Sequence, residues 1–168
     1  PMAIIDGILQ EFAHETTGTR KVLERLPEKE LGWKPHSKSM TMGILASHLA
    51  ETPSFVEAIV KQDELSFSMA NYKPLDLKSV KEIVERFDAN VAKAQKVMHG
   101  VSDAKLLLPW TLKGDGKVLF SMPRIAALRA MVLNHSVHHR GQLTVYLRLK
   151  DVPVPGLYGP SADEPMAH

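Results

Sequence analysis

The chain has 168 residues, of which 44% are hydrophobic and 24% charged, with a formal net charge of +2 and no cysteine. This length and composition predict one globular domain over residues 1–168 without a transmembrane segment, because no run approaches the roughly 20 apolar residues that span a bilayer. Lysines and arginines scattered among acids argue against a nucleic-acid partner, and the lack of cysteine excludes disulfides, thiolate ligands and a cysteine nucleophile.

The N-terminal segment is amphipathic and lacks the basic start and continuous apolar run of a secretory signal, so we expect a cytoplasmic protein with no membrane partner. A helix is predicted from about Ala3 to Leu26, before Pro27, because one stripe of residues recurs on steps of three and four. That stripe comprises Ile5, Ile8, Phe12, Thr16, Thr19, Leu23 and Leu26.

A second helix is predicted to follow a cap at Ser39 or Thr41 and to run to about Gln62. Pro53 lies inside it and removes one backbone donor, so we expect a bend about one turn beyond His48. Its stripe comprises Leu45, His48, Thr52, Phe55 and Ile59.

A third helix is predicted after a loop that contains Pro74, with Asp76 as a plausible cap and an end near Gly100. Its stripe comprises Val80, Val84, Phe87, Val91, Ala94, Met98 and Val101. Residues 109–120 have short β-prone runs on both sides of a Gly-Asp-Gly turn, which predicts a small hairpin or an irregular crossover.

The fourth helix is predicted to open at Ser121-Met-Pro and to continue through Leu149, and residues 152–160 are too rich in proline to be helical. Its buried stripe comprises Ile125, Leu128, Val132, His135, His139, Leu143 and Tyr146. Four amphipathic helices with long connections predict an all-α fold, a four-helix bundle with long crossover loops and a Pro-rich C-terminal tail.

Three histidines lie within these apolar stripes. His135 and His139 are four residues apart, so their rings lie on one helix face, and His48 lies on the stripe of a different helix. Buried imidazoles without partners are costly, and a shared metal ion removes that cost. Imidazole binds zinc, nickel, copper and iron well, so the pattern predicts a three-histidine metal site with open positions for water or substrate.

Two alternatives accompany this interpretation. A histidine on an apolar face is commonly satisfied by ordinary hydrogen bonds, and pairs of histidines also arise by chance in a chain that has eight of them. His138 competes with His139 as a ligand because it lies three residues from His135. The helical wheel turns His138 away from Leu128 and Val132, so we expect it to be near the site, at an interface or exposed.

The chain resembles the DinB (DinB/YfiT-like) family of metalloenzymes along nearly its whole length. The similarity lies in Ser39-Met-Thr41 leading to His48-Leu-Ala-Glu51, in the run from Leu133 to Leu143, and in the Pro-rich tail from Val152 to Glu164. The resemblance implies an up-down-down-up four-helix bundle and a homodimer. It also implies a divalent ion, usually nickel or zinc, on His48, His135 and His139.

Four further residues are candidates for roles beside the metal. Glu51, three residues after His48, would orient a ligand or accept a proton, and its alternative is a solvated helix surface. Arg140 would bind an anionic substrate or a carboxylate across an interface, although we expect it at the surface. Gln142 and Tyr146 would hydrogen-bond a histidine ring or a substrate, or simply line the core.

The sequence therefore favours a metal-dependent enzyme that acts on a small molecule, either a hydrolase or a thiol-dependent transferase. Characterised relatives of the resembled superfamily include transferases that use low-molecular-weight thiols and a thiol-dependent isomerase, which suggests such a thiol as substrate. The alternatives are a non-catalytic helical module with a structural or sensory metal, and a metal-free dimeric interaction protein. A fourth protein ligand would favour the structural metal, and Glu51 is the nearby candidate.

Overall fold

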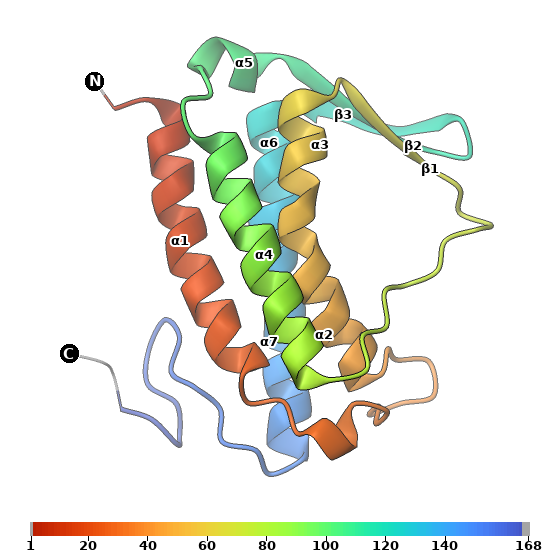
Figure 1. The fold of residues 1–168 in the computed structure, drawn as a ribbon, viewed down its shortest axis with the longest axis vertical. Coiled ribbons are helices and arrows are strands. Elements are labelled where there is room, and N and C mark those ends of the chain that lie inside the picture. The colour runs from red at the N-terminus through yellow and green to blue at the C-terminus, as the bar shows by residue number, and fades with distance from the viewer. Residues whose placement is uncertain (1, 166–168) are drawn as a thin grey trace.

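The computed structural model describes residues 2–165, and it places four long helical stretches side by side (Figure 1). They are α1 (Ile4–Leu23), α2 (Met42–Glu51) continued by α3 (Phe55–Lys61), α4 (Val80–Met98), and α6 (Arg124–Leu128) continued by α7 (Asn134–Leu149). Helix α7 contacts both α1 and α2, and α4 contacts the same two helices on their other side. No helix in the described residues is long and apolar enough to cross a membrane.

The prediction of an all-α fold is wrong, because a three-stranded mixed sheet covers one end of the helices, beside the short helix α5 (Asp103–Leu107) (Figure 1). The strands are β1 (Glu64–Phe67), β2 (Pro109–Gly114) and β3 (Lys117–Pro123). Strand β2 pairs antiparallel with β3 across a turn at Asp115-Gly116, which confirms the predicted hairpin. Strand β1 joins it in parallel, with Glu64 opposite Thr111 and Phe67 opposite Gly114.

The second predicted helix is interrupted at Pro53, where a bend was expected. A 3-10 turn over Thr52–Ser54 separates α2 from α3, and Pro53 provides no N–H for the helical ladder there. The hydroxyl of Thr52 donates to the carbonyl of His48 at 2.8 Å. At the start of α2, the Thr41 hydroxyl accepts from Ile44 N–H at 3.2 Å, so Thr41 is the cap. Hydrogen bonds from side chains therefore occur at both ends of α2, the helix that carries His48.

The other predicted boundaries shift by a few residues. Ser79, rather than Asp76, caps α4 and accepts from the N–H of Glu82. Residues 121–123 belong to β3, so the last helical stretch begins only at Arg124. A π-helical turn over Arg129–Leu133 interrupts that stretch just before His135. Such turns insert a residue into a helix and re-aim the side chains that follow, which the periodicity of the sequence does not reveal.

The apolar core consists of two clusters separated along the last helical stretch, Arg124 to Leu149. Val132 and Leu133 belong to the cluster beside the sheet, and Leu143 and Leu147 belong to the cluster at the opposite end. His135 and His139 lie between these positions, so the three-histidine cluster interrupts the apolar interior at the level where the two clusters meet.

One buried arginine connects the sheet to the helices. Arg124 is 1% exposed, and its guanidinium donates to the carbonyls of Pro109 (2.7 Å) and Gln62 (2.9 Å) and to Asp63 Oδ1 (2.6 Å). These groups lie at the start of β2 and just after the end of α3, and Arg124 itself is the first residue of α6. A single side chain therefore joins three elements.

We expect Arg124→Met to lower the free energy of unfolding by about 2 kcal/mol, because it removes the hydrogen bonds of a buried guanidinium to two backbone carbonyls and to Asp63. Urea denaturation measures the change. Arg129→Met is the matched control, since the exposed Arg129 forms only a surface ion pair with Glu11, and its loss should cost no more than about 1 kcal/mol. Equal losses in the two variants would contradict the assignment.

Candidate metal centre

Three imidazole rings converge between α2 and α7. His48 lies on α2, His135 and His139 lie one turn apart on α7, and one nitrogen of each ring lies within 4.8 Å of the others. The ring centroids are 4.6–4.9 Å apart. The His48 side chain is only 16% exposed. The structure thus brings together the three predicted histidines, with donor atoms close enough for one ion to bind all three.

Two of the ring nitrogens face each other directly. His48 Nε2 and His135 Nε2 are 2.9 Å apart. Two lone pairs at this distance repel, so either a proton on one ring or a cation between them must occupy the contact. A metal ion that binds both nitrogens takes the place of that proton, and each neutral ring then carries its one proton on Nδ1.

The surroundings favour the neutral form of His135 and His139. Burial and, to a smaller extent, the charges of the neighbouring histidines lower the pKa of His135 to about 4. Burial also lowers the pKa of His139, although its hydrogen bond to Gln142 acts in the opposite direction. Both rings are therefore neutral at pH 7, which is the form that binds a metal ion.

Gln142 fixes the proton of His139. Its side-chain Oε1 lies 2.7 Å from His139 Nδ1. An amide oxygen only accepts, so Nδ1 of His139 carries the proton and Nε2 keeps its lone pair. A hydrogen bond to the far nitrogen of a ligand ring is the usual way in which proteins orient a metal-binding histidine. Gln142 itself is exposed on α7, which places it at the border of the cluster.

Glu51 occupies the corresponding place behind His48. Its Oε2 lies 3.9 Å from His48 Nδ1, within ion-pair range but beyond hydrogen-bond length. Because His48 Nε2 faces His135, the carboxylate is on the opposite side of the ring from the cluster. Glu51 thus lies beside His48 and is not among the three residues whose donor atoms converge.

Two other candidate residues lie outside the cluster. His138 is exposed, and its ring packs edge-on against His139 with centroids 4.9 Å apart. Tyr146 is buried in the core, where its hydroxyl donates to the carbonyl of Met40 at 3.1 Å and its ring contacts Trp33 edge-on. Tyr146 thus lines the core, which is one of the two positions expected for it.

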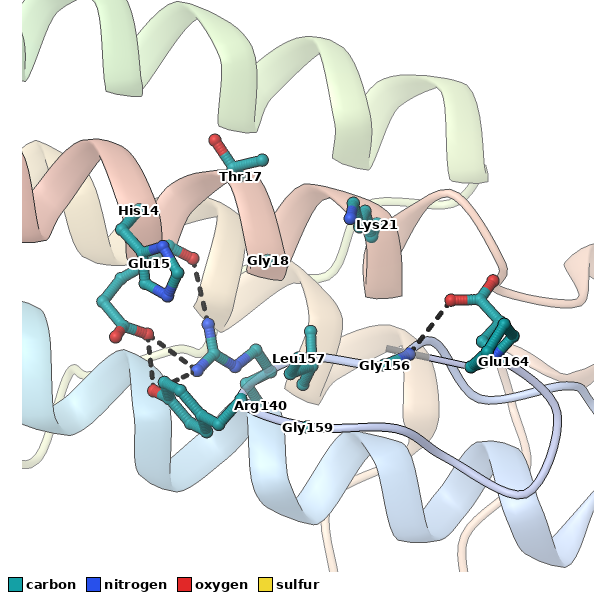
Figure 2. Close-up of a pocket in the computed structure, with 12 residues that line it drawn as sticks. His14, Glu15, Thr17, Gly18, Lys21, Arg140, Gly156, Leu157, Gly159 and Glu164 are labelled. Carbon is teal, nitrogen blue, oxygen red and sulfur yellow. Dashed lines mark hydrogen bonds and ion pairs between the residues drawn. The ribbon is translucent and has the colours of Figure 1, made fainter. Parts of the chain in front are cut away.

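The expected surface position of Arg140 is wrong. Arg140 is 2% exposed, and its guanidinium donates to Glu15 Oε2 (2.7 Å) and to the Glu15 carbonyl (3.0 Å) (Figure 2). It also donates to the hydroxyls of Thr19 (3.3 Å) and Tyr158 (2.5 Å). The Tyr158 hydroxyl in turn donates to Glu15 Oε2 at 2.7 Å. Arg140 therefore ties α7 to α1 and to the C-terminal tail within one chain.

Glu15 and Tyr158 are structural partners that the sequence reading missed. A signal for Glu15 existed, because it lies on the same helix face as Phe12 and Thr19, both buried. An acid on one core stripe and a base on another predict a buried ion pair. No comparable signal identifies Tyr158, since a tail without regular structure has no periodicity.

The arrangement defines a helical protein with a small sheet at one end and a three-histidine candidate metal centre between two of its helices. A model of the DinB superfamily matches residues 11–143, and the chain belongs to that superfamily.

Individual relatives agree with this assignment. The uncharacterized protein YrdA of Bacillus subtilis (strain 168) is 28% identical over 162 residues, which cover 95% of this chain and 91% of YrdA. The crystal structure of a DinB-like protein from Bacillus cereus ATCC 10987 matches with a TM-score of 0.73 and 24% identity, over 93% of this chain and 98% of that one. A DinB-like protein from Bacillus subtilis, YjoA, matches with a TM-score of 0.64 and 18% identity, over 88% and 96% of the two chains. The two structural matches show a shared fold.

For the metal-free protein, we expect the free energy of unfolding to fall as the pH is lowered from about 6.5 to about 4. The folded-state pKa of His135 is about 4 against an ordinary value of 6.5, so protons bind the unfolded state first. The full shift corresponds to at most roughly 3 kcal/mol. Urea denaturation in EDTA at stepped pH measures it.

His135→Gln should flatten this pH dependence, whereas His36→Gln, in an exposed loop, should leave it unchanged. An unaltered slope in His135→Gln would show that the acid sensitivity has another origin.

Proposed function

We propose that His48, His135 and His139 hold one divalent transition-metal ion, with zinc or nickel the best candidates. The observation that carries the proposal is the convergence of three imidazoles, from two helices, with one donor nitrogen each within 4.8 Å. Two supports are the lowered pKa values of His135 and His139, which favour the metal-binding form, and the proton of His139 directed to Gln142.

We further propose that the protein is a metal-dependent enzyme, either a hydrolase or a thiol-dependent transferase. Three protein ligands leave positions open, which is typical of catalytic rather than structural zinc sites. An ion bound there would act as a Lewis acid that lowers the pKa of water or of a thiol. The place of Glu51 behind His48 argues against a closed, four-ligand structural site.

Glu51 and Gln142 are then positioning residues. Each faces the Nδ1 of one histidine and favours the orientation that directs Nε2 toward the cluster. The low-molecular-weight thiol, the homodimer, the cytoplasmic location and the single domain over residues 1–168 remain predictions from the sequence and from the family resemblance.

Metal content tests the centre directly. We expect untagged protein that never meets a nickel column to contain about one equivalent of zinc or nickel per chain by plasma mass spectrometry, with little in a His135→Ala/His139→Ala variant. Avoiding the column matters because nickel and copper fill such sites regardless of physiology. His138→Ala is the matched control, since His138 neighbours the cluster without joining it, and it should retain the metal.

Parent protein that contains no metal, takes up none and is not stabilised by added zinc or nickel would overturn the proposed centre. A positive result selects the reactions to screen first, hydrolysis of activated esters and transfer of small thiols.

We expect Glu51→Gln and Gln142→Ala each to weaken zinc affinity roughly 10- to 100-fold, because residues that orient ligand histidines have effects of this size. Competition with a chromogenic chelator measures the affinity. Glu57→Gln is the control, because this carboxylate on α3 pairs with Lys61 and Lys93 instead of a histidine. Unchanged affinity in both test variants would remove their positioning role.

A further inference from the structure

A cavity of about 360 Å³ lies between α1 and the C-terminal tail (Figure 2). None of the three clustered histidines lines it. One wall is the face of α1 that carries His14, Thr17, Gly18 and Lys21 at steps of three and four. The tail segment 156–159 forms the opposite wall, together with Glu164 and Pro165. This volume lies at the lower end of the range for sites that bind small molecules.

Buried charged groups form the floor of the cavity. Arg140 and Glu15 are 2% and 8% exposed, and the Tyr158 hydroxyl joins them (Figure 2). At Gly18 the tail comes close, because a Cβ there would lie 3.1 Å from Arg140 Nη1 and 3.3 Å from Leu157 Cδ2. A glycine at this place therefore lets the tail close over α1 and shape the cavity.

Both carboxylates that line the cavity are paired with an arginine, whereas the lysine that lines it is not paired with an acid in the described residues. Glu15 is neutralised by Arg140, and Glu164 is neutralised by Arg25 while also accepting from the N–H of Gly156 at 3.0 Å. Lys21 forms no ion pair with any residue from 2 to 165, although it is close enough to Glu164 to contribute to that carboxyl's lowered pKa. The cavity is thus electrostatically suited to an anion near Lys21.

The tail also offers backbone donors. Within the described chain, the amide N–H groups of Leu157, Tyr158 and Gly159 donate no hydrogen bond, although all three residues line the cavity. The turn is tight at this point, because a Cβ on Gly156 would lie only 2.9 Å from the carbonyl oxygen of Gly159. Successive free N–H groups in a turn are a recurring way of binding oxyanions.

We propose that this cavity is a binding site for a small molecule that carries a carboxylate or phosphate group. The oxyanion is held by Lys21 and by the free N–H groups of 157–159, and the rest of the molecule lies over Gly18 toward His14 and Tyr158. The site is separate from the metal centre, because Arg140 extends from α7 toward α1 and the tail whereas His139 extends toward α2. It does not depend on the proposed enzymatic activity.

The test is a titration of ¹⁵N-labelled, metal-free protein with inorganic phosphate, followed by amide chemical shifts at constant ionic strength set by chloride. We expect saturating shifts at Leu157, Tyr158 and Gly159. Lys21→Gln should weaken the apparent affinity by about tenfold or more, as the loss of one charge-assisted contact does. A parallel titration with acetate shows which of the two oxyanions binds at lower concentration and hence the class of ligand.

Lys96→Gln is the matched control, because Lys96 is exposed on α4 and likewise forms no ion pair with residues 2–165. It should leave the titration unchanged. Absence of saturating shifts in 157–159, or equal affinity in Lys21→Gln and parent, would overturn the proposal. Metal content plays no part in this readout, so the failure of one proposal leaves the other intact.

Discussion

The constraint on which the structure depends is the crowding of three imidazoles where the two apolar clusters meet. Rings with centroids less than 5 Å apart disfavour added protons, since charged neighbours in a partly buried space repel. The lowered pKa values of His135 and His139 express first the cost of desolvation and second this repulsion. Such a cluster is stable as neutral rings or around a cation.

Helix α7 places its histidines toward α2 and an arginine toward α1. Successive residues of a helix are about 100° apart, so His139 and Arg140 point to different partners although they are adjacent. His139 faces His48 on α2, and Arg140 reaches Glu15 on α1 and Tyr158 in the tail. The ligand face and the anchoring face of α7 are thus fixed by consecutive residues, and the π turn at Arg129–Leu133 sets the phase of both.

Local periodicity was sufficient to predict the four helical stretches, the hairpin and the three histidines, because each of these signals lies within a short window of sequence. It missed strand β1, whose partners Thr111 to Gly114 lie far along the chain and whose four residues are too few to show a pattern. The charge of Arg140 suggested a surface position, but its spacing from the buried leucines indicated a buried one. Arg140 shares the buried stripe of Leu143 and Leu147, and that stripe pointed inward.

The Arg140–Glu15 pair contributes more to geometry than to stability. Removing a guanidinium and a carboxylate from water costs nearly as much as their attraction returns, so a buried ion pair is a poor source of net folding energy. A guanidinium nevertheless has donors in fixed directions, and here they are used by the backbone of α1, by a carboxylate and by two hydroxyls. Rotating α7 about its axis would break these bonds together. The rotation that keeps them is the one that directs His135 and His139 at His48, so the anchor on one side of the helix fixes the centre on the other.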